Sequence, residues 1–252
     1  MKDNRIGEKS YNNFGSIMII NKYRSCSDID IYFPEYNYVV CSKSYSDFKK
    51  GKIYCPYEPR VYGIGYFGVG EFKVRNENGK NSKAYTTWHD MLRRCYTDKW
   101  KSKNPTYEKC EVCNDWLNYQ NFANWFYQNY YSVDNEKMNL DKDILCKYNK
   151  TYSPETCIFV PHRINNLFIR RESKRGELPI GVMQSGNKYE ASYSNDRSIK
   201  TTLGLYDTPE EAFYVYKDYK EKLIKQLADK YRKFIPDRLY NAMYEYKVDI
   251  ND

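Results

Sequence analysis

The stretch from Leu140 to Ile169, LDKDILCKYNKTYSPETCIFVPHRINNLFI, decides how the centre of this chain folds. It begins with an apolar residue and two acids, Asp141 and Asp143, on either side of Lys142. A polar loop follows and closes at Pro154, a residue typical of turns. We therefore expect a strand that ends near the two acids, followed by a long loop.

A second strand and a short helix are predicted after this loop. Cys157–Val160 is a short apolar run with β-branched residues, which is the pattern of a strand. Pro161 suits the first turn of a helix, because its missing N–H would have no partner there. The helix is expected to pass through Asn165 and to end near Ile169. The whole stretch predicts a compact ββα unit.

This pattern resembles the HNH, or ββα-metal, nuclease finger in its phage-encoded branch. The resemblance spans about residues 60–170 and includes several motifs in the same order. In the finger, the matching residues are Leu140-Asp141-Lys142, Tyr152-Ser153-Pro154-Glu155-Thr156-Cys157, Ile158-Phe159-Val160 and Asn165. Upstream, they are Trp88, Met91, Arg94, Cys95, Tyr96, Tyr107, Val112, Cys113, Trp116 and Phe122. The resemblance implies a DNA-binding protein related to homing endonucleases.

The resemblance also implies a divalent metal, Mg²⁺ or Mn²⁺, if the finger is active. In such fingers, a carboxylate and a helix side chain hold one ion, which stabilises charge on the phosphate and on the leaving oxygen. By position, Asp141 is the first ligand and Asn165 is the ligand from the helix. His162, at the start of the helix, is either a further ligand or a solvent-facing residue.

The catalytic positions depart from the family pattern, because the family's general-base histidine is replaced by Lys142. A lysine has an ordinary pKa near 10.4, and that pKa would have to fall by about 3 units for a base at neutral pH. The neighbouring acids oppose such a fall, and Asp143 or a metal-bound hydroxide is the alternative base. Asn149 corresponds to the loop residue that orients the base. We therefore expect a degenerate ββα-metal finger, with nicking activity in question.

A second resemblance lies in residues 176–235. Three short strands are predicted at Ile180–Met183, Lys188–Ser194 and Ser198–Leu205. Asp207-Thr208-Pro209-Glu210 is a strong helix start, and the helix should run to about Tyr231. With Gly181-Val182, Lys188-Tyr189, Ala191, Leu203-Gly204, Glu210-Glu211-Ala212 and Tyr216, the segment resembles the plant apetala/ethylene-response and integrase-arm DNA-binding domain.

That domain places the outer face of its sheet in the major groove. The resemblance puts five residues on this face and Arg197 in the adjoining turn; the five are Lys188, Ser192, Ser194, Lys200 and Thr202. The arginines that follow Gly-Val in the family are absent here, so the resemblance implies phosphate contact more strongly than base readout. Further phosphate contacts are predicted in the basic linker and on a helix upstream of the finger. They are Arg170, Arg171, Lys174, Arg175, Arg93 and Arg94.

The residues before the finger predict a β-rich module and a helical segment. In residues 1–59, β-rich runs at 16–22, 29–33, 36–42, 45–48 and 52–54 indicate a small barrel or meander. A hairpin is then expected from Glu71–Val74 and Ala84–Thr86. Thr86 or Thr87 would cap the next helix, which buries Trp88 and its neighbours.

Cys110 and Cys113 have the spacing of one edge of a zinc site. A second pair at such spacing is missing, because Cys146 and Cys157 are eleven residues apart. Two close thiols without a second pair usually indicate buried cysteines. We therefore do not expect a structural zinc.

The amino-acid composition limits the classes of function that the chain can have. The net charge of +8 and the pI near 8.8 favour a polyanionic partner. The mean hydropathy of −0.90 and the lack of long apolar runs predict no membrane association. Eight cysteines without a secretion signal indicate reduced thiols, which is consistent with the cytoplasm of a host cell.

The fold class predicted from the whole chain is α+β. It comprises a small N-terminal β domain (1–59), an HNH-like ββα-metal domain with flanking helices (60–170), a three-stranded sheet plus helix (176–235) and a tail (236–252). Three functions remain open: a DNA-binding protein that nicks DNA, an inactive DNA-binding or regulatory protein, and a phage accessory protein that binds a host protein, for example a defence component. The sequence does not determine the oligomeric state.

Overall fold

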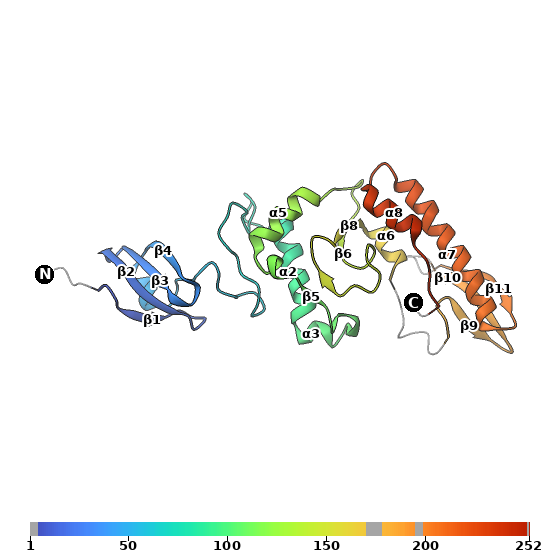
Figure 1. The fold of residues 1–252 in the computed structure, drawn as a ribbon, viewed down its shortest axis with the longest axis horizontal. Coiled ribbons are helices and arrows are strands. Elements are labelled where there is room, and N and C mark those ends of the chain that lie inside the picture. Colours follow the sequence, from blue (N-terminus) through green and yellow to red (C-terminus); the bar gives the residue numbers. More distant parts are fainter. Residues whose placement is uncertain (1–4, 170–177, 195–198, 251) are drawn as a thin grey trace. The chain divides into compact units, whose positions relative to one another are not determined.

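The computed structural model describes residues 5–169, 178–194, 199–250 and 252. The chain contains both helices and strands in separate segments, which confirms the α+β class (Figure 1). It forms two compact units, Met1–Gln128 and Asn129–Asp252. The division falls inside the predicted 60–170 domain, and the four-part domain scheme stays a prediction. No helix among the described residues is long and apolar enough to cross a membrane.

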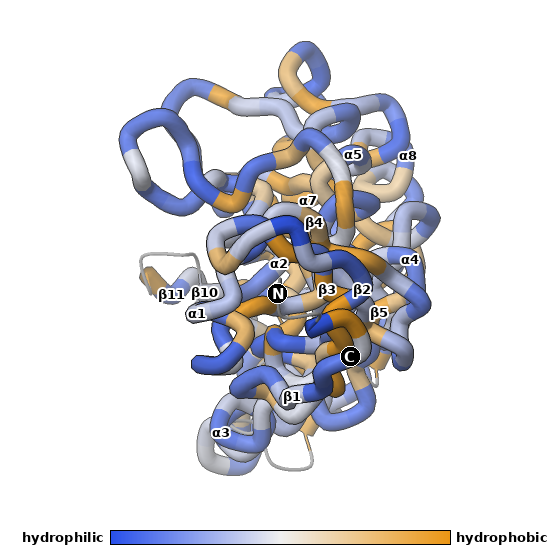
Figure 2. The backbone as a smooth tube through the Cα atoms, turned by 90° about the vertical axis from the view of Figure 1, so that its left-hand side faces the viewer, coloured by the Kyte–Doolittle hydropathy of each residue, from blue (hydrophilic) through white to orange (hydrophobic). Residues whose placement is uncertain are grey.

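The first unit begins with an antiparallel meander of four strands. They are β1 (Lys9–Tyr11), β2 (Ile17–Ser25), β3 (Asp28–Phe33) and β4 (Tyr38–Lys43), hydrogen-bonded in that order, with the short helix η1 (Pro34–Tyr36) before β4. Alternating side chains of β2 and β3, such as Ile20 and Ile31, are fully buried in one core. Hydrophobic segments of this sheet appear orange in Figure 2, close to the label of β3.

Two of the predicted β-rich runs in this module are not strands. Residues 52–54 belong to no helix or strand. Residues 45–48 belong to the helix α1 (Tyr45–Lys49). The Ser44 side chain accepts a hydrogen bond from the backbone N–H of Asp47, which caps the first turn. Phe48 is fully buried in the same core as the strands. A short aromatic run is compatible with a strand or with a helix, and here the Ser44 cap favours the helix.

The rest of this unit is mainly helical. Its elements are α2 (Lys83–Tyr96), α3 (Asp98–Lys101), η2 (Pro105–Tyr107), β5 (Glu111–Val112), α4 (Asn114–Leu117) and α5 (Tyr119–Asn129). The predicted buried face of α2 is confirmed, because Trp88, Met91, Leu92 and Cys95 are almost fully buried. The predicted strand Ala84–Thr86 is wrong, because α2 begins at Lys83 with Ser82 as its cap.

The second unit contains the ββα element. Strand β6 (Met138–Asp141) pairs antiparallel with β8 (Ile158–Pro161), and helix α6 (His162–Leu167) follows directly. The short strand β7 (Thr151–Tyr152) lies in the loop between them. The expected order of strand, loop, strand and helix is therefore confirmed, although Pro161 ends the strand instead of starting the helix.

The C-terminal sheet has the order β11-β10-β9, from β9 (Val182–Ser185), β10 (Lys188–Ser194) and β11 (Lys200–Tyr206). The long helix α7 (Pro209–Tyr231) starts with a complete capping box between Thr208 and Glu211. Ala212, Phe213 and Tyr216 of α7 share a core with the sheet.

The other end of α7 joins the core of the ββα element. Ile224, Ala228 and Tyr231 are buried with residues of β8 and α6. Helix α8 (Asp237–Glu245) contributes Leu239 and Met243 to this core.

Candidate nucleic-acid interface and finger site

Asp141 lies on the face of the β6–β8 hairpin that is turned toward α6. Asp141 pairs with Ile158 across the hairpin, and directly opposed residues point to the same side. Ile158 is buried in one cluster with Ile164 of α6. The predicted metal-binding carboxylate therefore lies on the side of the hairpin where the helix lies.

The same carboxylate also caps a turn. Its Oδ1 accepts hydrogen bonds from the backbone N–H groups of Asp143 and Ile144, at 2.9 and 2.7 Å. Burial, together with the nearby Asp143 carboxylate, raises the pKa of Asp141 to about 6. Within the described residues, Oδ2 accepts no hydrogen bond. The loop therefore supplies hydrogen bonds to Oδ1 of the carboxyl group, while Oδ2 accepts none from the described residues.

Lys142 is buried, with 6% of its surface exposed, and its ammonium group donates two hydrogen bonds. Nζ lies 2.8 Å from Asp143 Oδ2 and donates to the backbone oxygen of Asn149 at 3.1 Å. The ammonium also lies 5.8 Å from the centre of the Tyr152 ring. In return, Asn149 Nδ2 donates to the backbone oxygen of Lys142 at 2.8 Å. These reciprocal bonds close the loop between β6 and β7.

These contacts favour a structural role for Lys142. An amine that donates to a carboxylate and to a carbonyl carries its protons, whereas a general base must present a lone pair. Asn149 is likewise used within the loop, since its Nδ2 also donates to the backbone oxygen of Thr151 at 2.6 Å. Asp143 is more exposed, with 47% of its side chain accessible. The catalytic assignments of Lys142, Asp143 and Asn149 stay predictions.

His162 lies on α6 and is exposed between two asparagines. Its Nδ1 lies 3.0 Å from Asn139 Nδ2, and its Nε2 lies 3.3 Å from Asn166 Nδ2. Asn139 and Asp141 are two residues apart in β6, so their side chains lie on the same face of the strand, the one toward α6. Asn165 lies in the same helix and is half-buried. The fold therefore puts Asp141 and Asn165 on facing elements.

The donor set suits a hard divalent ion better than a soft one. Asp141 and Asn165 offer oxygen atoms, which Mg²⁺ and Mn²⁺ prefer. Among the described residues, no three His, Cys, Asp or Glu side chains converge on one point. A site at the hairpin would thus consist of one carboxylate, one amide and water molecules, an arrangement that Mg²⁺ tolerates. The chemistry of these two side chains fits such an ion, and the metal site stays a prediction.

Of the residues predicted to contact DNA from the C-terminal sheet, Ser192 is wrong as an exposed contact, because only 8% of its surface is accessible. The others among the described residues are exposed, namely Lys188, Ser194, Lys200 and Thr202. Ala191 of β10 is buried against α7, so its neighbour Glu190 points to the opposite face. Glu190 Oε1 lies 2.8 Å from Lys200 Nζ and accepts a hydrogen bond from Thr202 Oγ1 at 2.8 Å. These bonds place Lys200 and Thr202 on the open face.

Lys188 extends this face at the start of β10 and forms an ion pair of 3.1 Å with Asp207. The lysines of the sheet are therefore partnered by acids. Glu190 was not among the predicted site residues, because the family pattern emphasises the cations of this face. Its position two residues after Lys188 in a strand was the available signal.

Arg93 and Arg94 are half-buried on α2. Arg93 forms an ion pair with Asp90 at 3.1 Å, and its guanidinium lies 4.8 Å from the centre of the Trp100 ring. The predicted linker contacts and one turn residue lie outside the described residues. They are Arg170, Arg171, Lys174, Arg175 and Arg197.

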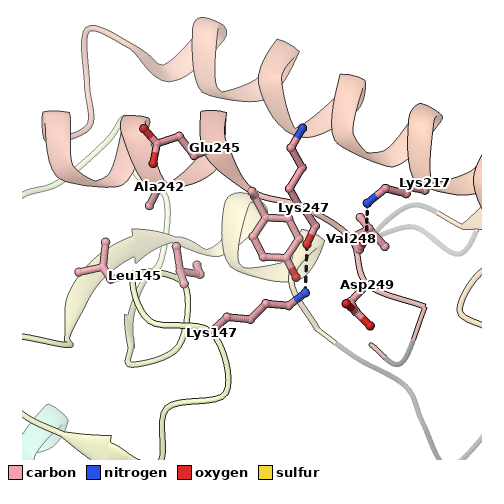
Figure 3. A pocket seen from close by; sticks show the side chains of 10 residues that line it. Leu145, Lys147, Lys217, Ala242, Glu245, Lys247, Val248 and Asp249 are labelled. Carbon is pink, nitrogen blue, oxygen red and sulfur yellow. Dashed lines mark hydrogen bonds between the residues drawn. The ribbon is translucent and has the colours of Figure 1, made fainter.

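A pocket of about 390 Å³ lies beside the loop that follows β6, where α7, α8 and the segment after α8 line it (Figure 3). Lys147 donates to the backbone oxygen of Lys247 at 3.0 Å and pairs with Asp252 at 2.8 Å. Lys217 donates to the backbone oxygen of Val248 and pairs with Glu221 at 2.7 Å. Because both lysines are satisfied by protein groups, the pocket is not an evident anion site.

His89 lies on α2 and pairs with Tyr62. The Tyr62 hydroxyl lies 3.1 Å from His89 Nε2, and the two ring centres are 4.9 Å apart. Burial lowers the pKa of His89 below its ordinary value. The histidine is therefore neutral at physiological pH and packs among aromatic rings, which is consistent with a structural role.

No family model, curated protein or solved structure matches the chain.

Proposed function

We propose that this chain binds double-stranded DNA. The observation that carries the proposal is the three-stranded sheet β9–β11, which α7 covers on one face only. The opposite face presents Lys188, Lys200 and Thr202 as exposed side chains. The major groove is wide enough to admit a helix or a two-stranded ribbon, and a small sheet can enter it by its edge and outer face.

The ββα element supports the same proposal, because its order of elements is that of the finger it resembles. The resemblance implies a phage-type protein related to HNH homing endonucleases, acting in the cytoplasm of a host cell. Since the two catalytic positions at Lys142 and Asn149 are tied into the loop, DNA binding is the primary function that we propose.

A test follows from Glu190, which holds both Lys200 and Thr202. Glu190→Gln removes a negative charge from the proposed interface and frees Lys200 for phosphate. We expect several-fold tighter binding to a duplex, measured by fluorescence anisotropy, and a salt slope steeper by about 1. Lys200→Gln should weaken binding.

The matched control is Glu35→Gln, which removes an exposed acid from η1 in the other unit. Equal effects of the two acid substitutions would indicate a general charge effect and would contradict an interface at the sheet.

Metal-dependent nicking is a second candidate, favoured by the placement of Asp141 on the side of α6. When bound, Mg²⁺ or Mn²⁺ would stabilise negative charge on the cleaved phosphate. Asp141 and Asn165 would hold the ion, and Asp143 is the exposed carboxylate nearest in sequence to accept a proton. Conversion of supercoiled plasmid should then depend on metal and be lost in Asp141→Ala and Asn165→Ala. Persistent DNA binding without nicking would leave the finger as a scaffold.

A protein partner is the third candidate. Met183 and Leu205 are each 54% exposed, and both pair with Glu190 from the neighbouring strands. Exposed apolar side chains around an acid are more typical of a protein contact than of a phosphate contact. If the full chain shows no affinity for duplex DNA, an accessory protein that binds a host protein becomes the better hypothesis.

A further inference from the structure

The first unit carries a β-ribbon that none of the predicted sites includes. Residues 72–82, called here the basic ribbon, run out and back before α2. Ser82 N–H donates to the backbone oxygen of Val74, and Asn76 N–H donates to that of Lys80, both at 2.8 Å. Arg75 and Asn81 form an isolated bridge between the two arms. The ribbon is thus a short antiparallel hairpin.

The tip of the basic ribbon is ordered by its own side chains. Asn76 Oδ1 accepts hydrogen bonds from the backbone N–H groups of Asn78 and Lys80, at 3.1 and 3.0 Å. Gly79 has a φ of +72°, a conformation that glycine adopts without strain. The turn is therefore formed before any partner binds, which lowers the entropic cost of binding.

The base of the basic ribbon is fixed to α5. Gln120 Oε1 accepts from the backbone N–H of Phe72 at 3.0 Å, and Gln120 Nε2 donates to the backbone oxygen of Phe72 at 3.0 Å. The Phe72 ring stacks on Tyr127 at 5.3 Å between ring centres. The Tyr119 hydroxyl donates to the backbone oxygen of Lys73 at 3.0 Å. The ribbon therefore projects from a rigid support.

Its cations distinguish this ribbon from the C-terminal sheet. Lys73, Arg75 and Lys80 are exposed, and none of them forms an ion pair with a described residue. Lys188 and Lys200 of the sheet, in contrast, are both paired with acids. Cations that form no ion pair within the protein can contact DNA phosphates directly. The counterions condensed on the DNA are then released, and no protein ion pair has to be broken first.

We propose that the basic ribbon is a DNA-binding arm that contacts the phosphates of a duplex through Lys73, Arg75 and Lys80. The occupant follows from charge complementarity. Three exposed cations against one exposed acid, Glu77, leave the preformed hairpin with a net positive charge, which matches the regular negative charge of the duplex backbone. This inference rests on the proposed DNA-binding function and assigns part of that function to a second surface, in the first unit.

The test compares two full-length triple variants. The ribbon variant carries Lys73→Gln, Arg75→Gln and Lys80→Gln. The control carries Lys22→Gln, Lys43→Gln and Lys52→Gln, which remove the same charge from exposed positions in the N-terminal module. Duplex affinity is measured by anisotropy between 50 and 300 mM salt, roughly the range in which counterion release is resolved. Arg75→Gln alone serves as a second variant if the triple variant is unstable.

We expect the ribbon variant to bind duplex at least tenfold more weakly and to lower the salt slope by about 2 to 3, since each lost phosphate contact removes about 0.9. The control should keep most of the wild-type affinity. If wild-type protein binds and the two variants are indistinguishable, the ribbon has no specific role. If wild-type protein does not bind duplex at all, the proposed function itself fails.

Discussion

At the residue scale, Lys142 occupies the position where the resembled family has its general base, and its contacts show what a lysine does there. Nζ joins Asp143 to the backbone of Asn149, and Tyr152 covers the ammonium group. A buried cation with these partners holds a polar loop in one conformation. A sequence reveals the substitution of the base, but not the partners that favour a structural role for the lysine.

Replacing Lys142 by methionine tests this role, because methionine keeps the apolar stem and removes the charge. The backbone oxygen of Asn149 then loses its donor in a largely buried position, which should lower the free energy of unfolding by about 1–3 kcal/mol. Urea unfolding measures the change. Lys99→Met, at an exposed position of α3, should stay within about 0.5 kcal/mol of wild type. Equal stabilities of the two variants would contradict the structural role.

The raised pKa of Asp141 predicts that the free energy of unfolding depends on pH. Its pKa rises from 3.8 to about 6 on folding, so the folded state binds this proton more tightly than the unfolded state. The stability that protonation contributes is present below about pH 4 and is lost as the pH rises through about 6. Asp141→Asn keeps an oxygen acceptor for the two backbone N–H groups and removes the charge.

We therefore expect Asp141→Asn to be more stable than wild type at pH 7, by about 1–3 kcal/mol, with the difference vanishing near pH 4. Denaturant unfolding from pH 4 to 8 measures this difference. A variant that is less stable than wild type at pH 7 would show that the ionised carboxylate is needed for the loop.

At the scale of elements, hydrophobic patterning predicted most strands and helices. In two places where it predicted a strand wrongly, a capping side chain starts a helix instead. The buried positions of α2 and the ββα order were visible in the sequence. Ser44 and Ser82 set the starts of α1 and α2, and both helices begin where strands were predicted. A serine before an aromatic run permits a cap, but the sequence does not show whether its oxygen will be used.

Ser82 has two partners that make its removal costly. Its oxygen accepts from the backbone N–H of Tyr85 at 3.1 Å and lies 3.1 Å from the Tyr119 hydroxyl. Ser82→Ala should lower the free energy of unfolding by about 1–2 kcal/mol. Thermal or urea unfolding beside Ser102→Ala, an exposed serine after α3, checks this value. If both variants lose the same stability, the cap is not important for α2.

At the scale of the whole molecule, positive charge is concentrated in the first unit. Counting Lys and Arg against Asp and Glu, residues 1–128 carry +6 (20 against 14) and residues 129–252 carry +2 (21 against 19). Family resemblance directed the predicted contacts mainly to the second unit. This distribution of charge is one reason why we propose a second DNA-contacting surface, in the first unit.

The most direct measurement is the affinity of the full-length wild-type chain for a duplex of mixed sequence as a function of salt. We expect the logarithm of the affinity to fall linearly with the logarithm of the salt concentration, with a slope of about −3 or steeper, since at least three phosphate contacts are proposed. No binding at low salt, or an affinity that does not change with salt, would contradict the proposal that this chain binds DNA.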